Sequence, residues 1–374
     1  MPSPLVSVII PVFNGVNYLC EAIDSVLSQT YPKIELVIVD DGSTDATWDI
    51  IQRYGLKVSG YHKENGGVAS ALNLGISKAH GDYIGWLSHD DVFLPEKIEN
   101  QVNYFLVHPE FDACYTDFVV MDKLGKMIHT HHTPWYPGSD IPRQFLRNMY
   151  INGSTTLINK SVFMVTGMFD EKLAFTQDMD MWVRISEKFE FGHLPEVLLK
   201  SRSHPEQGSW NFEIQISEDR SFFTNMFQKL GPSGVFPELT CKMDKSYQMA
   251  LGLEKMGDET WKYRHWYSFA LEQYRKSYGI SPSIRIWAKS NLAIIAVALL
   301  GDENDYLFMV KRARFLLSSG DRITARKLCA VMFQKYPLRL DAVLIWIGTF
   351  ISPRVQKSLV KLKRLLLNSS IKIV

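Results

Sequence analysis

The residues of this sequence best suited to chemistry are aspartates that follow short apolar stretches. Asp40 and Asp41 end one such stretch, and Asp90 and Asp91 end another. Two neighbouring carboxylates repel each other unless a cation lies nearby. Hard oxygen ligands suit Mg²⁺ or Mn²⁺, which bind through one or two carboxylates together with substrate phosphates. The second pair therefore predicts a divalent-metal site, and the structural alternative for Asp91 is a cap before the helix that follows.

Alternating strand and helix signals position these aspartates within the first 120 residues. Strands buried on both faces and joined by amphipathic helices predict a doubly wound parallel sheet. Ligands bind beyond the carboxyl ends of such strands, so polar clusters that follow the first, second and fourth strands should meet at one edge. The predicted strands are Val6–Val12, Glu35–Val39, Leu56–Tyr61 and Tyr83–Leu87, and the clusters are Pro11–Asn14, Asp40–Asp45 and Ser88–Asp91.

The alternation ends near residue 112. Ala113–Met121 and Ser154–Asn159 are predicted strands, and between them lies a loop rich in His, Pro and Gly at Ile128–Pro142. Nearly everything after residue 213 has a helical pattern. We therefore predict an α/β domain over residues 1–212 with an appended all-helical region over residues 213–374.

Composition excludes several other classes of protein. With 374 residues, 46% hydrophobic residues and a net charge of +1, the chain is an ordinary globular protein without the basic charge that nucleic acid attracts. The four cysteines are scattered, which argues against a thiolate metal site and fits a reducing, cytoplasmic compartment. The sequence has neither a GxGxxG after the first strand nor a GxxxxGK[ST], which disfavours Rossmann dehydrogenases and P-loop enzymes.

Four ordered motifs resemble those of the family 2 glycosyltransferases, inverting enzymes with the GT-A fold that use nucleotide-sugar donors. The motifs are SVIIPVFN at 7–14, VDDGSTD at 39–45, NGGVASALNLG at 65–75 and GDYIGWLSHDD at 81–91. The resemblance covers roughly residues 5–210. It implies a mostly parallel GT-A sheet flanked by helices.

The resemblance also implies a set of donor contacts. Asp41 is expected to read the base, because a carboxylate accepts a hydrogen bond from an imide N–H such as that of uracil. Asp40 lies beside it, and two asparagines are expected to shape the donor pocket. The full set that the resemblance assigns to nucleotide or donor is Pro11, Phe13, Asn14, Asp40, Asp41, Asn65, Asn73 and Asp90.

The second aspartate pair, Asp90 and Asp91, corresponds to the family's DxD-type element, which binds metal and ribose. Ser88 stands where many members have the first aspartate, so Asp90 takes the metal position with Asp91 beside it. The segment 202–209 resembles the loop that closes over the donor diphosphate. Its His204 is expected to be a further metal or diphosphate ligand, with a purely structural histidine as the alternative.

The family's acidic motif near the acceptor, usually Glu-Asp, matches Gln177 and Asp178. Asp178 is therefore expected to be the general base. The alternative is that Asp178 or Asp180 only stabilises a helix N-terminus, where negative charge is favoured.

The expected reaction is a Mn²⁺- or Mg²⁺-assisted transfer of sugar, with inversion, from a nucleotide-diphosphate sugar such as a UDP-sugar. The acceptor is a glycan or lipid-linked hydroxyl in cell-surface polysaccharide synthesis. The departures at Ser88 and Gln177 keep open a catalytically silent GT-A domain that serves as a binding or scaffold protein. A nucleotidyltransferase is the third reading, although 11–14 offers no Gly-rich basic loop.

The end of the chain is basic. From Ala342 to Val374 it has no Asp or Glu and six Lys or Arg residues, with leucines close to one helical face. Such a helix is predicted to lie on an anionic membrane surface, which would place the protein peripherally on the inner face of the membrane. The alternative is a helix docked on the protein itself with a solvated basic face.

Overall fold

A computed structural model of the chain describes residues 3–146, 149–204, 207 and 212–235. The chain divides into two compact units, Met1–Thr240 and Cys241–Val374. The first unit includes helix α8 (Phe212–Val235), so it extends past the predicted boundary at residue 212. The predicted helical region beyond residue 235 and the basic tail lie outside the described residues. Within the described part, no helix is long and apolar enough to cross a membrane.

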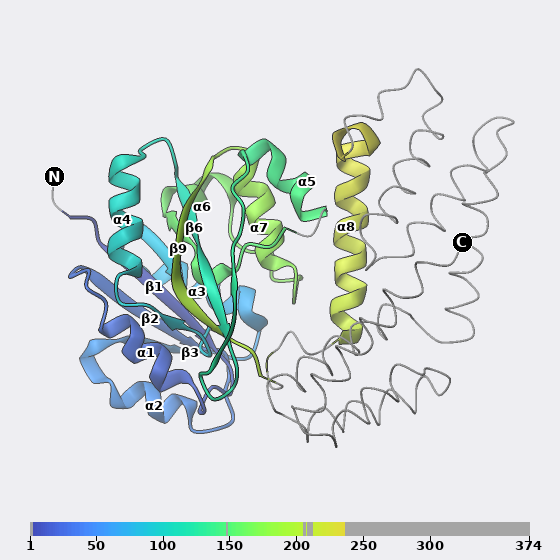
Figure 1. The fold of residues 1–374 in the computed structure, drawn as a ribbon. Helices are drawn as coiled ribbons and strands as arrows, with labels where there is room; N and C mark the ends of the chain where they lie inside the picture. Colours follow the sequence, from blue (N-terminus) through green and yellow to red (C-terminus); the bar gives the residue numbers. More distant parts are fainter. Residues whose placement is uncertain (1–2, 147–148, 205–206, 208–211, 236–374) are drawn as a thin grey trace, which may run out of the picture. The chain divides into compact units, whose positions relative to one another are not determined.

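The first unit is built on a nine-stranded mixed sheet (Figure 1). The four N-terminal strands are parallel and lie in the order β3-β2-β1-β4. They are β1 (Val6–Val12), β2 (Ile34–Asp40), β3 (Ser59–His62) and β4 (Tyr83–Trp86). This half of the sheet confirms the predicted GT-A type of α/β fold.

The second half of the sheet is mixed. β8 runs antiparallel to β4 and to β6, whereas β6 and β9 are parallel. β5 pairs with β9, and β7 forms a hairpin with β6 inside the segment that the sequence predicts to be a loop. The bounds of these strands are β5 (Val92–Phe93), β6 (Ala113–Met121), β7 (Met127–His131), β8 (Leu157–Asn159) and β9 (Phe191–Arg202).

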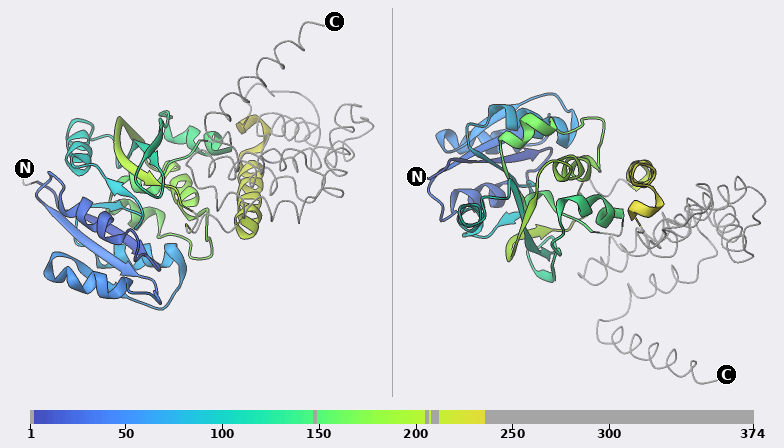
Figure 2. Two further views of the ribbon diagram at one scale, coloured as in Figure 1. Left: turned by 60° about the horizontal axis from the view of Figure 1, so that its bottom comes forward. Right: turned by 90° about the horizontal axis from the view of Figure 1, so that it is seen from above.

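Helices cover both faces of the sheet, as the two further views show (Figure 2). Alternate β1 side chains point to opposite faces. Val8 and Ile10 join the core formed with α1, α2 and α4, whereas Ile9 faces α3. The helices are α1 (Leu19–Leu27), α2 (Thr47–Arg53), α3 (Gly67–Lys78), α4 (Lys97–Val107), α5 (Ile141–Leu146), α6 (Ser161–Thr166) and α7 (Gln177–Ser186), with short 3-10 turns η1 (Gly55–Lys57), η2 (Gly138–Asp140) and η3 (Gly153–Thr155).

Two close backbone approaches fix the layers near the carboxyl edge of the sheet. A Cβ on Gly75 of α3 would lie 2.5 Å from Ile9 Cγ2, and a Cβ on Gly153 of η3 would lie 2.2 Å from the ring of Trp86. Only glycine permits contacts this close. Gly153 therefore allows η3 to lie against the end of β4, where the second aspartate pair follows.

One lysine is wholly inside the first unit. Lys97 is fully buried, its Nζ donates to Gln101 Oε1 at 2.7 Å, and it lies 4.2 Å from the centroid of the Phe93 ring. Burial lowers its pKa to about 7, because the charged ammonium is removed from water.

Lys97→Met is expected to stabilise the fold at neutral pH. In the unfolded chain the lysine stays protonated below its ordinary pKa of 10.5, whereas in the folded chain it loses its proton above about 7. Stability thus falls as pH decreases from 10.5 to 7, and removing the amine should recover up to about 4 kcal/mol at pH 7, less about 1 kcal/mol for the lost hydrogen bond. Urea unfolding at pH 7 and pH 10 measures the difference.

The exposed Lys57→Met variant is the matched control, and its stability should change little at either pH. A Lys97→Met gain that is absent at pH 7, or equal at pH 7 and pH 10, would contradict a neutral buried amine.

Candidate active site

The polar segments after β1, β2 and β4 lie together at one edge of the sheet. Val12 is paired in register with Asp40, and the Asp41 amide donates to Val12 O at 2.8 Å. The turn after β1 also meets the loop after β4, since a Cβ on Gly15 would lie 2.8 Å from the ring of His89. The structure thus brings together the three clusters that the sequence places at strand ends.

The turn after β1 is held to the turn after β2 by Asn14. This residue has a left-handed backbone with φ 52°, its amide donates to Ser43 Oγ at 2.8 Å, and its Oδ1 accepts from the Thr44 amide at 2.8 Å. Pro11 is buried within β1, whereas the Phe13 ring is 46% exposed beside this turn. Phe13 and Asn14 are therefore the exposed residues of this motif, and their contact with a nucleotide stays a prediction.

The first aspartate pair is buried and hydrogen-bonded. Asp40 accepts from His62 Nδ1 at 2.8 Å. Asp41 accepts from the amides of Gly66 and Gly67 at 3.0 and 2.7 Å and pairs with Lys63 Nζ at 2.6 Å. Because these amides begin α3, the carboxylate of Asp41 stabilises the start of that helix. Both oxygens of Asp41 are engaged by these partners, and its contact with a nucleotide base stays a prediction.

The two asparagines assigned to the donor pocket differ in their surroundings. Asn65 lies exposed in the turn before α3. Asn73, in the middle of α3, uses its amide group to hold another segment: Nδ2 donates to Phe169 O at 3.0 Å and to Glu171 Oε1 at 2.9 Å, and Oδ1 accepts from the Phe169 amide. In this structure Asn73 links α3 to the segment before α7, and its contact with a donor stays a prediction.

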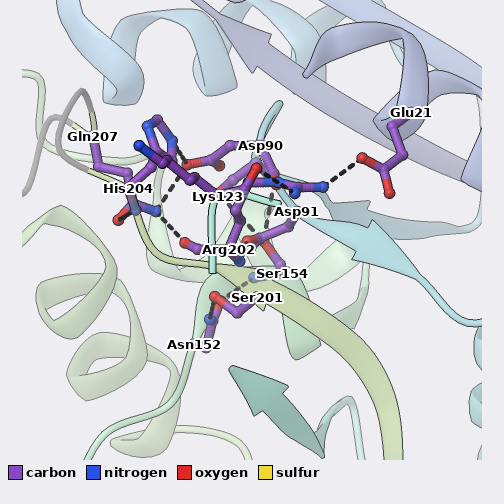
Figure 3. A network of polar contacts seen from close by, with 11 residues as sticks. Glu21, Asp90, Asp91, Lys123, Asn152, Ser154, Ser201, Arg202, His204 and Gln207 are labelled. Carbon is purple, nitrogen blue, oxygen red and sulfur yellow. Dashed lines mark hydrogen bonds and ion pairs between the residues drawn. The ribbon is translucent and has the colours of Figure 1, made fainter. Parts of the chain in front are cut away.

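Asp90 faces a histidine and a glutamine from the segment after β9 (Figure 3). Its Oδ2 accepts from Gln207 Nε2 at 2.8 Å and lies 3.0 Å from His204 Nε2. Burial works against the charged form, but the hydrogen bonds from His204 and Gln207 hold the pKa of Asp90 below its usual value. Asp90 and His204 therefore form a buried carboxylate–imidazole pair.

Asp91 points to a different group of residues (Figure 3). Its Oδ1 accepts from the Arg202 amide at 2.8 Å and its Oδ2 from Ser154 Oγ at 2.9 Å. Burial, together with the nearby charge of Asp90, raises the pKa of Asp91 to about 8. Ser88 stands at the position of the family's first aspartate. Its backbone amide donates to Ser154 Oγ at 3.1 Å. Asp91 and Ser88 thus hold η3 and the end of β9, and a metal contact of Asp91 stays a prediction.

Arg202 ties this site together, although no sequence motif assigns a role to it. Its Nε donates to the Asp90 carbonyl at 2.9 Å, its guanidinium pairs with Glu21, and the same group lies 4.6 Å from the centroid of the Tyr18 ring. Tyr18 in turn packs against His204, with ring centroids 4.7 Å apart. Arg202 is buried, so these contacts fix the backbone that carries Asp90.

Asp90 and His204 have the chemistry of divalent-cation ligands, but their contact here is a hydrogen bond of 3.0 Å between Asp90 Oδ2 and His204 Nε2, which a cation bound by both atoms would replace. Binding of a metal by this pair stays a prediction. Among the described residues no group of three or more His, Cys, Asp or Glu has metal-binding geometry. Such an ion would therefore take its remaining ligands from water and a diphosphate, as is usual for Mg²⁺ sites.

Asp178 lies in the first turn of α7. It is 7% exposed, and its Oδ1 accepts from the Met179 amide at 2.7 Å. Burial raises its pKa to about 7, and the charges of Asp219 and Glu218 on α8 act in the same direction. Such a carboxyl changes protonation near neutral pH, as a general base must.

The neighbours of Asp178 on α7 differ from it. Asp180 is paired with Arg184 at 2.7 Å, which commits its carboxylate to an ion pair within the helix. Gln177, where the family usually has Glu, has a buried Oε1 without a hydrogen-bond partner among the described residues. The geometry therefore favours Asp178 over Asp180 as the base.

Tyr150 lies within electrostatic reach of Asp178 and of the second aspartate pair. Burial of its hydroxyl raises the pKa of the phenol, and the charges of Asp178, Asp91 and Asp90 add to the effect. The three carboxylates therefore lie in the same region of the molecule. The sequence position of Tyr150 carries no signal, since the segment around it has no motif.

The histidines of the predicted loop are partly structural. His132 Nδ1 lies 2.6 Å from Asp117 Oδ2, and His193 Nε2 lies 2.9 Å from Asp117 Oδ1. His131 packs on Phe118, with ring centroids 4.8 Å apart. His129 is exposed.

A mixed GT-A type sheet with carboxylates at its carboxyl edge defines a class of α/β transferase fold. The chain belongs to glycosyl transferase family 2, whose model matches residues 7–167. An uncharacterised glycosyltransferase of Rickettsia typhi is 41% identical over 235 residues, which cover 61% of this chain and 73% of that protein. The chondroitin synthase of Pasteurella multocida is 33% identical over 209 residues, covering 55% of this chain and 21% of that protein.

The fold has a counterpart among solved structures. S. aureus TarS 1–349, crystallised in complex with UDP-GlcNAc, aligns with a TM-score of 0.50 and 17% identity over 76% of this chain and 88% of that chain. At this identity the likeness concerns the fold. Together with the family match it confirms the predicted family and the predicted GT-A fold.

Proposed function

We propose that the chain transfers a sugar from a UDP-sugar to a hydroxyl of a glycan or lipid-linked acceptor, in the synthesis of a surface polysaccharide. The observation that carries the proposal is the convergence of the segments after β1, β2 and β4 at the carboxyl edge of the sheet, where Asp90 and His204 are in contact, together with the buried Asp178 at the start of α7. Family membership supports a transferase. The similar P. multocida protein is named a chondroitin synthase, and TarS was crystallised with UDP-GlcNAc, which supports the acceptor and donor classes.

The role of the donor half of the site is to offset the negative charge of the leaving diphosphate. Asp90 and His204 would hold Mn²⁺ or Mg²⁺, which as a Lewis acid neutralises the charge that grows on the departing diphosphate. Asp41 and the exposed Phe13 would border the base, because they line the edge next to these ligands. Arg202 keeps the backbone carbonyl of Asp90 in place and so orients its carboxylate.

The role of the acceptor half of the site is to remove a proton from the acceptor, and Asp178 is the residue that would do so. Its carboxylate would take the proton of the acceptor hydroxyl while that oxygen attacks the anomeric carbon and the bond to the diphosphate breaks. The transition state is oxocarbenium-like. One displacement inverts the anomeric centre, so the site needs no protein nucleophile.

The rate is expected to depend on pH through Asp178. A base works only when unprotonated, and burial raises the pKa of Asp178 to about 7. The value of kcat/KM should therefore fall about tenfold for each pH unit below 7 and level off above it. A pH–rate profile at fixed Mn²⁺ measures this, and an acid limb centred near pH 4 would argue against a buried base.

The proposed activity is tested by incubating the full chain with a panel of UDP-sugars and Mn²⁺ and analysing the products. Release of UDP, with transfer to an added glycan or slow donor hydrolysis, is the expected result. Release of pyrophosphate would instead support a nucleotidyltransferase. Donor binding without any turnover across the panel would support a silent binding domain.

A further inference from the structure

Glu218 of α8 is hydrogen-bonded to the segment that leads into α7. The Glu218 carboxylate accepts from the backbone amides of Ala174, Phe175 and Thr176 at 2.8, 2.8 and 2.6 Å. It also accepts from the Thr176 hydroxyl at 2.8 Å. One half-buried side chain thus receives four hydrogen bonds from three consecutive residues.

These bonds fix the backbone immediately before α7. The first amides of a helix and of the turn leading into it have no partner within the helix. A carboxylate placed there is favoured by the helix dipole and makes charge-assisted hydrogen bonds, which are stronger than neutral ones. Asp178 follows Thr176 by two residues, so the position of its backbone depends on this anchor.

A second contact links α8 to the other end of α7. Lys229 of α8 pairs with Glu187, the residue after the last turn of α7. Glu218 and Lys229 are as far apart in the sequence as their partners Thr176 and Glu187. α8 also packs through the buried Phe227 and contacts α5. α8 therefore packs on α5 and reaches both ends of α7 through side chains, although it lies beyond the residues that the family model matches.

We propose that Glu218 is a positioning residue that sets the place of the Asp178 carboxylate. The inference rests on the proposed function, because it takes Asp178 as the base. The charged or titratable groups facing Asp178 are Glu218 and Asp219 from α8 and Tyr150 from the segment before η3. On its own helix, Asp180 is neutralised by Arg184.

Glu218→Ala removes all four bonds, whereas Glu218→Gln keeps the size and one acceptor oxygen. With the full chain, Glu218→Ala is expected to lower kcat about 100-fold, as misplacement of a catalytic group by about 1 Å does. The KM for the donor should stay within about twofold, because the donor half of the site is untouched. Glu218→Gln should recover part of kcat.

Two further readouts separate positioning from a general loss of structure. Loss of the negative charge beside Asp178 should move the acid limb of the pH–rate profile of Glu218→Gln to lower pH. Hydrogen exchange of the 174–178 amides should speed up in Glu218→Ala, while exchange in β1 stays unchanged. Glu187→Gln, which breaks the contact at the far end of α7, is the matched control and should keep kcat near wild type.

Unchanged kcat together with an unchanged pH profile in both Glu218 variants would overturn the proposal. Equal losses of kcat in Glu218→Ala and Glu187→Gln would also overturn it, since the effect would then be one of general packing. Failure of the proposed function would give a different pattern of results. If Asp178 is not the base, Asp178→Asn keeps wild-type turnover, while the hydrogen exchange of the 174–178 amides still speeds up in Glu218→Ala.

Discussion

Asp178→Asn is expected to lower turnover about 10³-fold, within the range that general-base catalysis contributes. The asparagine keeps the size of the side chain and can still accept the hydrogen bond that Asp178 receives from the Met179 amide. It cannot take a proton. The initial rate of UDP release with donor and acceptor at saturation measures the loss.

The donor affinity of Asp178→Asn should stay within about twofold of wild type, because Asp178 lies outside the proposed diphosphate-binding half of the site. Asp180→Asn is the matched control, since Asp180 is committed to Arg184. It should lose some stability and little turnover. Turnover retained in Asp178→Asn, or lost in Asp180→Asn instead, would move the base to Asp180.

Asp90→Asn is expected to remove most of the dependence of donor binding on Mn²⁺. In the proposed metal site the Asp90 carboxylate is the charged oxygen ligand beside His204, and a neutral amide binds a hard cation weakly. A cation that offsets charge on a leaving group contributes several kcal/mol, so turnover should fall about 10³-fold. Titrating Mn²⁺ against donor affinity and rate, in wild type and variant, gives both effects.

Asp91→Asn separates the two neighbouring aspartates. Both oxygens of Asp91 are hydrogen-bonded, to the Arg202 amide and to Ser154. This variant should therefore lose thermal stability while its Mn²⁺ dependence persists. The opposite pattern, with Mn²⁺ dependence lost in Asp91→Asn and kept in Asp90→Asn, would exchange the two assignments.

The N-terminal half of the fold could be predicted because its signals are local. The run 6–12 is apolar apart from Ser7 and is buried throughout. The strand ends carry Asp, Gly and Ser, which turn chemistry and ligand contacts both favour. The adjacency of Pro11–Asn14 to Asp40 follows directly from the parallel pairing of β1 and β2.

The rest could not be predicted because it depends on contacts between distant segments. Arg202 and Asp90 meet across 112 positions, and neither residue type signals the other. β7, which pairs with the predicted strand β6, lies in a segment with polar residues and histidines, which masks the strand pattern. Glu218 lies beyond the motifs altogether, and its carboxylate becomes informative only once the 174–176 amides are seen to converge on it.

The most direct test of the central claim is calorimetric titration of UDP into the full chain with Mn²⁺ and again with EDTA. A Mn²⁺-dependent nucleotide-sugar site predicts binding of UDP in Mn²⁺ and binding at least about tenfold weaker in EDTA, since the cation would link Asp90 and His204 to the diphosphate. The Asp90→Asn variant should behave in Mn²⁺ as wild type does in EDTA. Absence of UDP binding under both conditions, or equal binding in Mn²⁺ and EDTA, would contradict the account.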